Sequence, residues 1–363
     1  MRYLSKTNPK ALRGVALIRL DFNTEDEWRM EASLTTLKFL LKVAEKVIVV
    51  SHRGRPKGVE KKFSLQKDAR RLRGYLHRPV HFISRLNFKV IQKTIDEAPK
   101  GSLFVFENLR FDPGEGKNDR RFAKSLASLA DFYVNDAFAV SHRDAASVVA
   151  ITKFLPSYAG FELEAEIREL SQVMKHPKRP VIMVLGGGKA HDKLGVIKYF
   201  LGTAQAFLLG GASANTISAV RGIDVKKSKV DDDIHDKPLL KKIANHPTVI
   251  VPIDVRMKND AILDIGPHTE KLFARYIKSA RTIVWSGPLG FIEDKKFSHG
   301  NLSVARAIAA NRKAFTVAGG GETVMFLKKY HLDKKFSFIS TGGGAMLGFL
   351  AGEKLPGIEA LKK

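Results

Sequence analysis

The sequence alternates between short apolar runs and stretches in which apolar residues recur at helical spacing. In the first half, the apolar runs lie at 15–22, 46–52, 79–84, 102–108 and 131–138. In the second half, they lie at 181–187, 206–211, 248–255, 282–288, 314–320 and 336–341. Helical stretches such as 31–44 and 119–129 separate these runs. This alternation is typical of βαβ units, and it predicts parallel sheets covered by helices.

The length of the chain, 363 residues, is large for one hydrophobic core, so we expect two domains. A charged amphipathic stretch at 161–180 separates the halves and is typical of a connecting helix. The predicted fold is α/β, with two doubly wound, Rossmann-like parallel-sheet domains. The expected boundaries are 1–157 for the N-terminal domain, 158–178 for the connecting helix, 179–347 for the second domain and 348–363 for a C-terminal segment that returns toward the first.

The absence of cysteine excludes disulfides and thiolate metal sites, and a reducing compartment is natural for such a chain. The first apolar run, 15–18, is too short for a signal peptide. The uncharged stretch 201–220 has the length of a membrane span, but its many polar residues favour a buried strand, turn and helix. We therefore expect a cytoplasmic protein that does not bind membranes.

The chain is strongly basic, with 62 Lys and Arg against 37 Asp and Glu and a net charge of +25. This balance predicts attraction to anions, from small phosphates to nucleic acid, without choosing between them. The densest basic run, 67–78, is amphipathic. A solvated helix face is the commoner interpretation of such a run, and a patch that binds polyanions is the alternative.

Polar residues follow the predicted strands of the first half, where ligands of parallel sheets bind. Asp21 and Asn23 follow the first strand, and basic side chains follow three others. These basic side chains are His52, Arg55, Arg110 and Arg143. One guanidinium group can bind two oxygens of a phosphate or carboxylate at once. The recurrence of arginine at strand ends therefore predicts a site for a small phosphorylated acid.

Glycine-rich loops follow the predicted strands of the second half, at 186–193, 210–216, 286–291, 319–323 and 340–345. Glycine lets the backbone approach a ligand, and the helix that follows offers free N–H groups to phosphate. Lys189 and Lys193 would share one helix face beside the first of these loops. Five such loops in one sheet predict a nucleotide or polyphosphate site, and the two halves together suggest phosphoryl transfer between a small acid and a nucleotide.

These motifs resemble those of the phosphoglycerate kinase family, in the family's order, from about residue 14 to residue 361. The matching stretches are RLDFN (19–23), RMEASLTTL (29–37), SHRGRPKG (51–58), ENLRF (107–111), VNDAF…SHR (134–143), GGGKAHDK (186–193), DIGP (264–267), WSGPLGFIE (285–293), GGGET (319–323) and ISTGGGA (339–345). The resemblance implies reversible phosphoryl transfer from 1,3-bisphosphoglycerate to ADP, giving 3-phosphoglycerate and ATP, after closure of the two domains.

The resemblance also implies roles for individual residues. The groups that would bind 3-phosphoglycerate or its acyl phosphate are Asp21, Asn23, Arg29, His52, Arg55, Arg110 and Arg143. Arg29 would stabilise the transferring phosphoryl group, and Lys189 and Lys193 would assist from the nucleotide side. The residues that would bind the nucleotide are Gly187, Lys193, Gly210, Gly211, Ser286, Pro288, Glu293, Gly320, Gly321, Glu322 and Thr323. Glu293 would hold the ribose, and Glu322 would ligate Mg²⁺ at the nucleotide phosphates.

Several positions depart from the family pattern, and three of them lie at predicted functional positions. Ser286 replaces an asparagine, Phe338 replaces a histidine that pairs with the equivalent of Glu166, and Glu322 replaces an aspartate. These departures leave open a catalytically weakened binding protein on the same fold. The positive charge leaves open a nucleic-acid-binding protein, although no specific nucleic-acid motif is present. An oxidoreductase is disfavoured because GxGxxG does not follow the first strand. We expect a monomer that binds Mg²⁺ with ADP or ATP.

Overall fold

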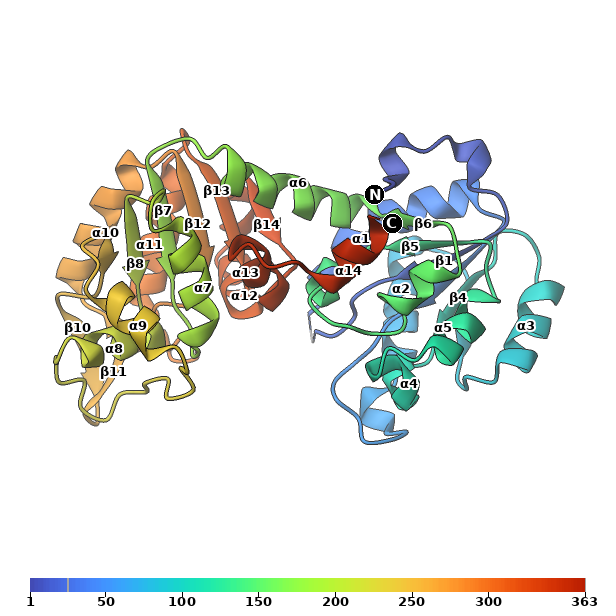
Figure 1. Cartoon of the computed structure of the whole chain (residues 1–363), viewed down its shortest axis with the longest axis horizontal. Helices are drawn as coiled ribbons and strands as arrows, with labels where there is room; N and C mark the ends of the chain where they lie inside the picture. Colours follow the sequence, from blue (N-terminus) through green and yellow to red (C-terminus); the bar gives the residue numbers. More distant parts are fainter. Residues whose placement is uncertain (25, 363) are drawn as a thin grey trace. The chain divides into compact units, whose positions relative to one another are not determined.

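The computed structural model describes residues 1–24 and 26–362, and the chain forms two compact units (Figure 1). Unit 1 contains residues 1–168 and the segment that starts at Lys354, and unit 2 contains Glu169–Glu353. Unit 2 is therefore one continuous stretch of chain, whereas unit 1 is assembled from two separate stretches.

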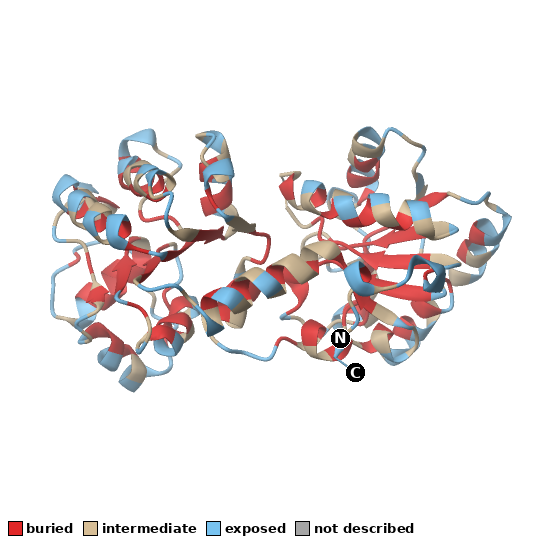
Figure 2. Cartoon of the chain, turned by 90° about the horizontal axis from the view of Figure 1, so that it is seen from above, coloured by how far each residue is buried: buried red, intermediate tan, exposed pale blue. Residues whose placement is uncertain are grey.

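The centre of unit 1 is a parallel six-stranded sheet in the order β3-β4-β2-β1-β5-β6. Its strands are β1 (Val15–Arg19), β2 (Lys46–Val50), β3 (His81–Ile83), β4 (Leu103–Phe106), β5 (Phe132–Asn135) and β6 (Ser157–Ala159). The inner strands are buried between helices (Figure 2). The predicted parallel α/β fold is thus confirmed for this unit, with β6 as an additional short strand.

Helices cover the unit 1 sheet. They are α1 (Trp28–Val43), α2 (Gln66–Leu76), α3 (Phe88–Glu97), α4 (Pro113–Gly116), α5 (Arg120–Ala127) and α14 (Pro356–Leu361). Leu37 and Leu40 of α1 pack into the same apolar core as β1 and β2. Asp119 caps α5, because its carboxylate accepts a hydrogen bond from the Phe122 N–H at 2.8 Å. At the C-terminal end, the N–H of Gly357 donates to the Ser141 carbonyl at 2.9 Å, which attaches α14 to unit 1.

Unit 2 also contains a parallel six-stranded sheet, in the order β14-β13-β12-β7-β8-β9. Its strands are β7 (Val181–Leu185), β8 (Ala206–Leu209), β9 (Val249–Ile250), β12 (Thr282–Ser286), β13 (Phe315–Gly319) and β14 (Phe338–Ser340). An antiparallel hairpin, β10 (Val255–Lys258) and β11 (Ala261–Ile265), is separate from it. The predicted strand at 248–255 was too long. Pro252 has no N–H, and the N–H groups of Ile253 and Asp254 donate to Thr269 Oγ1 instead of to a strand.

The helices of unit 2 are α7 (His191–Phe200), α8 (Gly211–Val220), α9 (Lys237–Ala244), α10 (Pro267–Ser279), α11 (His299–Ala310), α12 (Gly321–Lys329) and α13 (Gly344–Leu350). The uncharged stretch at 201–220 forms β8 and α8, which confirms the predicted strand, turn and helix. Within the described residues, every helix is too short or too polar to cross a membrane.

The helix α6 (Phe161–Lys175) connects the two sheets along the chain. It begins in unit 1 and continues into unit 2 after Arg168. Asp136 anchors its first turn, because Oδ1 accepts hydrogen bonds from the N–H groups of Glu162 and Leu163 at 2.9 and 3.2 Å. Only glycine fits at position 160, since a Cβ there would lie 2.2 Å from this oxygen. Burial raises the pKa of Asp136 to about 6.

The pKa of Asp136 makes a testable contribution to stability. The pKa of Asp136 is higher in the folded protein than the ordinary value of 3.8. Its favourable contribution to the free energy of unfolding is therefore complete below pH 3.8 and is lost as pH rises through about 6. Asp136→Asn keeps an oxygen acceptor and does not ionise. We expect the variant to gain stability relative to wild type between about pH 4 and 7, by at most about 3 kcal/mol. Urea unfolding at a series of pH values measures this, and a difference independent of pH would contradict the assignment.

Candidate active site

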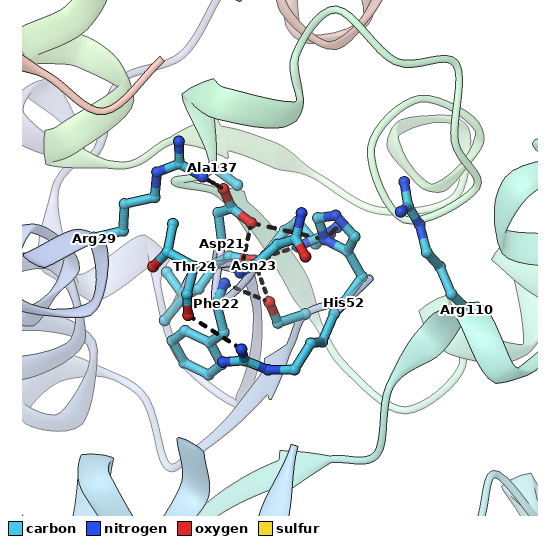
Figure 3. Close-up of polar contacts among 12 residues, drawn as sticks. Asp21, Phe22, Asn23, Thr24, Arg29, His52, Arg110 and Ala137 are labelled. Carbon is cyan, nitrogen blue, oxygen red and sulfur yellow. Dashed lines mark hydrogen bonds and ion pairs between the residues drawn. The ribbon is translucent and has the colours of Figure 1, made fainter. Parts of the chain in front are cut away.

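The loops after β1 and β2 meet at the carboxyl edge of the unit 1 sheet, because these strands are parallel neighbours. Ser51 ties the two loops together. Its Oγ accepts a hydrogen bond from the Phe22 N–H at 2.9 Å and donates to the Leu20 carbonyl at 2.8 Å. The predicted site residues that follow these strands therefore lie together (Figure 3).

Asp21 organises this cluster (Figure 3). Its Oδ2 accepts a hydrogen bond from Arg29 Nη1 at 2.6 Å, and its Oδ1 accepts one from the Asn23 N–H at 3.1 Å. Arg29 is the second residue of α1, and its guanidinium lies 5.3 Å from the centre of the Trp28 ring. Its Nε is buried and has no hydrogen-bond partner among the described residues. Asp21 and Trp28 thus fix a guanidinium that retains an unpaired donor.

His52 is a buried neutral imidazole. Its Nδ1 lies 3.0 Å from Arg19 Nη2 and 3.8 Å from Asp21 Oδ1. Burial, and after it the positive charge of Arg19, hold the pKa of His52 well below its usual value. His52 therefore contributes hydrogen bonding to this site, whereas the arginines contribute charge.

Gly54 connects the cluster to the next arginine. Its N–H donates to Asn23 Oδ1 at 2.7 Å, and its carbonyl accepts from Arg110 Nη1 at 2.5 Å. The position requires glycine, since φ is +61° and a Cβ would lie 2.3 Å from the Phe63 ring. Arg110 also contributes to a cavity of about 490 Å³. The lining residues are Arg55, Pro56, Arg110, Asp112, Pro113, Gly116, His142 and Arg143.

The cavity is electropositive. Burial lowers the pKa of Arg143, and the charges of Arg55, Arg19 and Arg29 lower it further, while the carboxylate of Asp21 opposes this shift. The charges that act most strongly on Arg143 are therefore three guanidinium groups and one carboxylate. This excess of positive charge favours a ligand with more than one anionic group.

Arg53 has a structural role instead. Its guanidinium forms a two-point ion pair with Asp68, at 2.7 and 3.3 Å, and also donates to the Thr24 carbonyl. Its backbone carbonyl accepts from Asn108 Nδ2 at 2.8 Å. These contacts hold the loop after β2 in the conformation that places Arg55, two residues later, in the cavity lining.

A second cavity, of about 470 Å³, lies at the carboxyl edge of the unit 2 sheet, among the loops after β7, β12, β13 and β14. Its lining residues are Gly187, Gly188, Lys189, Asp192, Lys193, Lys229, Ser286, Gly287, Gly320, Gly321, Glu322, Thr323, Gly343, Gly344 and Leu347. The Gly287 N–H donates to Thr323 Oγ1 at 2.9 Å, which joins two of these loops. A Cβ on Gly287 would lie 2.3 Å from the Gly186 carbonyl, so the backbones touch directly. The glycines of these loops thus form a wall of backbone peptide groups that is suited to phosphate, here called the glycine wall.

The two predicted lysines differ in their surroundings. Lys193, in the first turn of α7, is only 7% exposed, and burial lowers its pKa while nearby carboxylates oppose the shift. Its Nζ lies 3.8 Å from where a Cβ on Gly187 would be, so the ammonium group faces the glycine wall. Lys189 is exposed and lines the same cavity. The arrangement supplies one buried and one exposed positive charge to a phosphate group.

Glu322, in the first turn of α12, is exposed and lines the same cavity. A carboxylate is a ligand that Mg²⁺ prefers. In the described part of the chain, no group of three His, Cys, Asp or Glu side chains is arranged to hold a metal ion. Glu322 is thus a single carboxylate in the lining of this cavity, and its role as a metal ligand stays a prediction.

Four predicted nucleotide residues lie outside the lining of this cavity: Gly210, Gly211, Pro288 and Glu293. A Cβ on Gly210 would lie 2.7 Å from Leu289 Cα, and the Pro288 carbonyl accepts from the Gly187 N–H at 2.7 Å. These two positions hold neighbouring loops in close contact. Glu293 is exposed in a turn. The binding roles of the four residues stay predictions.

Two charged residues of this cavity were not predicted, namely Asp192 and Lys229. Asp192 lies between the two predicted lysines in the GGGKAHDK motif. This position could have indicated that Asp192 lines the same site. Lys229 lies in a segment without helix or strand, so no strand-end pattern pointed to it. Its Nζ is 3.1 Å from where a Cβ on Gly188 would be.

An arginine-lined cavity on one parallel sheet and a glycine-lined cavity on another define the class of the protein as an α/β phosphotransferase. The family model described as phosphoglycerate kinase matches residues 13–353. The chain belongs to the phosphoglycerate kinase family.

Curated relatives and solved structures agree with this membership. The phosphoglycerate kinase of Desulfosudis oleivorans is 39% identical, over 96% of each chain, and that of Thermus thermophilus is 39% identical over the whole of both. The solved phosphoglycerate kinase of Pyrococcus horikoshii covers 100% of this chain and 98% of its own, with a TM-score of 0.88 and 31% identity. That of Coxiella burnetii covers 99% and 98%, with a TM-score of 0.82 and 30% identity.

Proposed function

We propose that this protein catalyses the reversible transfer of the acyl phosphate of 1,3-bisphosphoglycerate to ADP, giving 3-phosphoglycerate and ATP. The observation that carries the proposal is the presence, in one chain of this family, of an arginine-lined anion cavity and a glycine-lined phosphate cavity. Family membership does not favour a pure binding protein or a nucleic-acid-binding protein. In this proposal each unit binds one substrate, and transfer follows closure of the units.

Unit 1 would bind the phosphoglycerate. Arg55, Arg110 and Arg143 would hold its anionic groups, and neutral His52 would donate a hydrogen bond to them. Arg29, fixed by Asp21 at 2.6 Å, would approach the phosphoryl group in transfer. A fixed cation near developing charge lowers the barrier because it needs no reorganisation during the reaction.

Unit 2 would bind the nucleotide. The N-terminus of α12 and the glycine loops would hold its phosphates, and Lys189 and Lys193 would neutralise charge on the transferring group. Mg²⁺, held by the nucleotide phosphates and Glu322, would supply additional charge neutralisation. Because no covalent nucleophile is needed, positioning and positive charge are the contributions that this chain makes.

A coupled assay on the purified protein tests the proposal. Formation of 1,3-bisphosphoglycerate from ATP and 3-phosphoglycerate is followed through NADH oxidation by added glyceraldehyde-3-phosphate dehydrogenase. We expect turnover that requires both substrates, measured with Mg²⁺ and Mn²⁺ and with ATP and GTP. Nucleotide binding without turnover under all these conditions would instead support a binding protein on this fold.

Glu322→Gln tests the metal role. The variant keeps the size of the side chain but loses the charge that Mg²⁺ prefers. We expect the Mg²⁺ concentration for half-maximal turnover to rise several-fold, with a similar shift in the Mg²⁺ dependence of ADP binding. Glu353→Gln, at another exposed position of unit 2, is the matched control. If Glu322→Gln leaves both dependences unchanged, Glu322 does not ligate the metal.

A further inference from the structure

Arg19, the last residue of β1, is a guanidinium buried beneath the unit 1 site, with 1% of the residue exposed. Its Nη2 lies 3.0 Å from His52 Nδ1, its Nε donates to Ser147 Oγ at 2.9 Å, and its Nη1 donates to the Leu20 carbonyl. A buried charge is costly unless it is paired and hydrogen-bonded. Its contacts therefore indicate a specific role, which the strand-end pattern did not reveal.

The contact with His52 has only one possible polarity. Arginine has donors and no acceptor, so Nδ1 of His52 must accept the hydrogen bond and carry no proton. The imidazole is neutral, so its single N–H is on Nε2. That atom is buried and has no hydrogen-bond partner among the described residues. Arg19 thus fixes the tautomer in which the unpaired atom is a donor.

A second buried pair orients Arg19 itself. The Ser147 hydroxyl donates its one proton to Glu115 Oε1 at 2.6 Å, so its oxygen must accept from Arg19 Nε. The Ser147 N–H donates to Glu115 Oε2 at 2.9 Å, and this carboxylate lies 4.0 Å from Arg19 Nη2. The donors therefore run in one direction, from Arg19 through Ser147 to Glu115. The guanidinium is held from behind by a counter-charge.

We propose that Arg19 is a positioning residue: supported by Ser147 and Glu115, it holds His52 as the Nε2–H tautomer, so that this neutral imidazole donates to an anionic oxygen of the acidic substrate. The inference rests on the proposed function for the identity of that substrate. A purely structural Arg19 would stabilise unit 1 without controlling the proton on His52.

The groups around His52 determine the effect of losing Arg19. The charged groups that act on it are Arg19, Asp21, Arg29, Arg53 and Arg143. Without Arg19, the carboxylate of Asp21, 3.8 Å from Nδ1, favours a proton on Nδ1. In the neutral ring Nε2 then loses its proton and can no longer donate. At low pH both nitrogens are protonated, and donation returns.

Arg19→Met tests this directly. We expect the KM for 3-phosphoglycerate to rise about tenfold or more near pH 8, the loss expected for one hydrogen bond to a charged group, and to fall toward the wild-type value as the pH is lowered far enough to protonate both nitrogens of His52. The KM for ATP stays unchanged. Arg19→Lys, which keeps a cationic donor, restores most of the loss. Arg221→Met is the control, since it removes a partly buried guanidinium that donates to the Ala244 and Val249 carbonyls of unit 2.

A spectroscopic reading of the tautomer needs no substrate. In ¹⁵N spectra of histidine-labelled protein, the His52 signals are identified by their absence in His52→Gln. We expect Nδ1 to be unprotonated and Nε2 to be protonated at neutral pH. In Arg19→Met, Nδ1 becomes protonated. If that variant does not fold, Arg19→Met with Glu115→Gln removes both buried charges, and the same change is expected.

Two results would overturn the inference: an unchanged His52 tautomer in a folded Arg19 variant, or a rise in KM that is the same at every pH. A wild-type protein that shows the expected tautomer but no turnover would contradict the proposed function and leave the positioning of His52 intact.

Discussion

Replacing Arg29 with alanine is expected to lower turnover by about three orders of magnitude and to leave the affinity for ADP unchanged. Arg29 is held by Asp21 at 2.6 Å and by the face of the Trp28 ring. It belongs to unit 1, whereas the predicted nucleotide-binding loops belong to unit 2. An interaction made only in the transition state affects kcat, whereas ground-state binding of the nucleotide does not depend on it. Steady-state kinetics with ATP and 3-phosphoglycerate, together with ADP titration, measure the two quantities.

Arg71→Ala is the matched control for Arg29→Ala. Arg71 also pairs with a carboxylate of unit 1, Glu27, at 3.0 Å, and it lies outside the site. We expect near wild-type kcat for this control. Near-normal turnover in folded Arg29→Ala would remove Arg29 from the reaction, and a loss confined to KM would assign it to substrate binding alone.

Replacing Lys193 with methionine is expected to reduce kcat/KM for ATP by about two to three orders of magnitude. Methionine keeps most of the volume of a side chain that is only 7% exposed, so the change removes the charge and leaves the packing of α7 largely intact. A cation in a water-poor cavity acts strongly on the phosphoryl charge, since the surroundings screen it weakly. Burial already lowers the pKa of this lysine, so the protein bears the cost of keeping it charged there.

Lys198→Met provides the comparison, because Lys198 is exposed on the same helix. It removes an equal charge, so a general electrostatic effect would appear in both variants. We expect full activity for Lys198→Met. Equal losses in the two variants would show that the net charge of unit 2, rather than the contact of Lys193 with the glycine wall, determines the rate.

Much of the fold could be predicted because buried parallel strands are continuous apolar runs. The break after Ile250 was missed, although Pro252, which has no N–H, is visible in the sequence. The other part of its cause could not be predicted, because Thr269 accepts from the N–H groups of Ile253 and Asp254 from a position farther along the chain. β6 was missed because its three residues, Ser157–Ala159, include only one large side chain and make no recognisable apolar run.

The site followed the same division. The strand-end rule located Asp21 and His52, since it depends only on strand direction. It named Arg55 and not Arg53 without the physical reason, which is the carboxylate of Asp68 that pairs with the Arg53 guanidinium. Arg19 is a single charge in an apolar run, and its role depends on Glu115, a distant partner.

The two-part origin of unit 1 has a consequence for biosynthesis. A ribosome completes the whole of unit 2 before it reaches Gly357, whose N–H binds the Ser141 carbonyl. The nascent chain therefore carries a unit 1 that still lacks α14, whose Ile358 and Leu361 are buried in the finished protein. Unit 2, being continuous, can fold as soon as it emerges, whereas unit 1 lacks α14 until unit 2 has been translated. The apolar surface of unit 1 that α14 covers therefore stays exposed while unit 2 is translated, and a chaperone can bind it during that time.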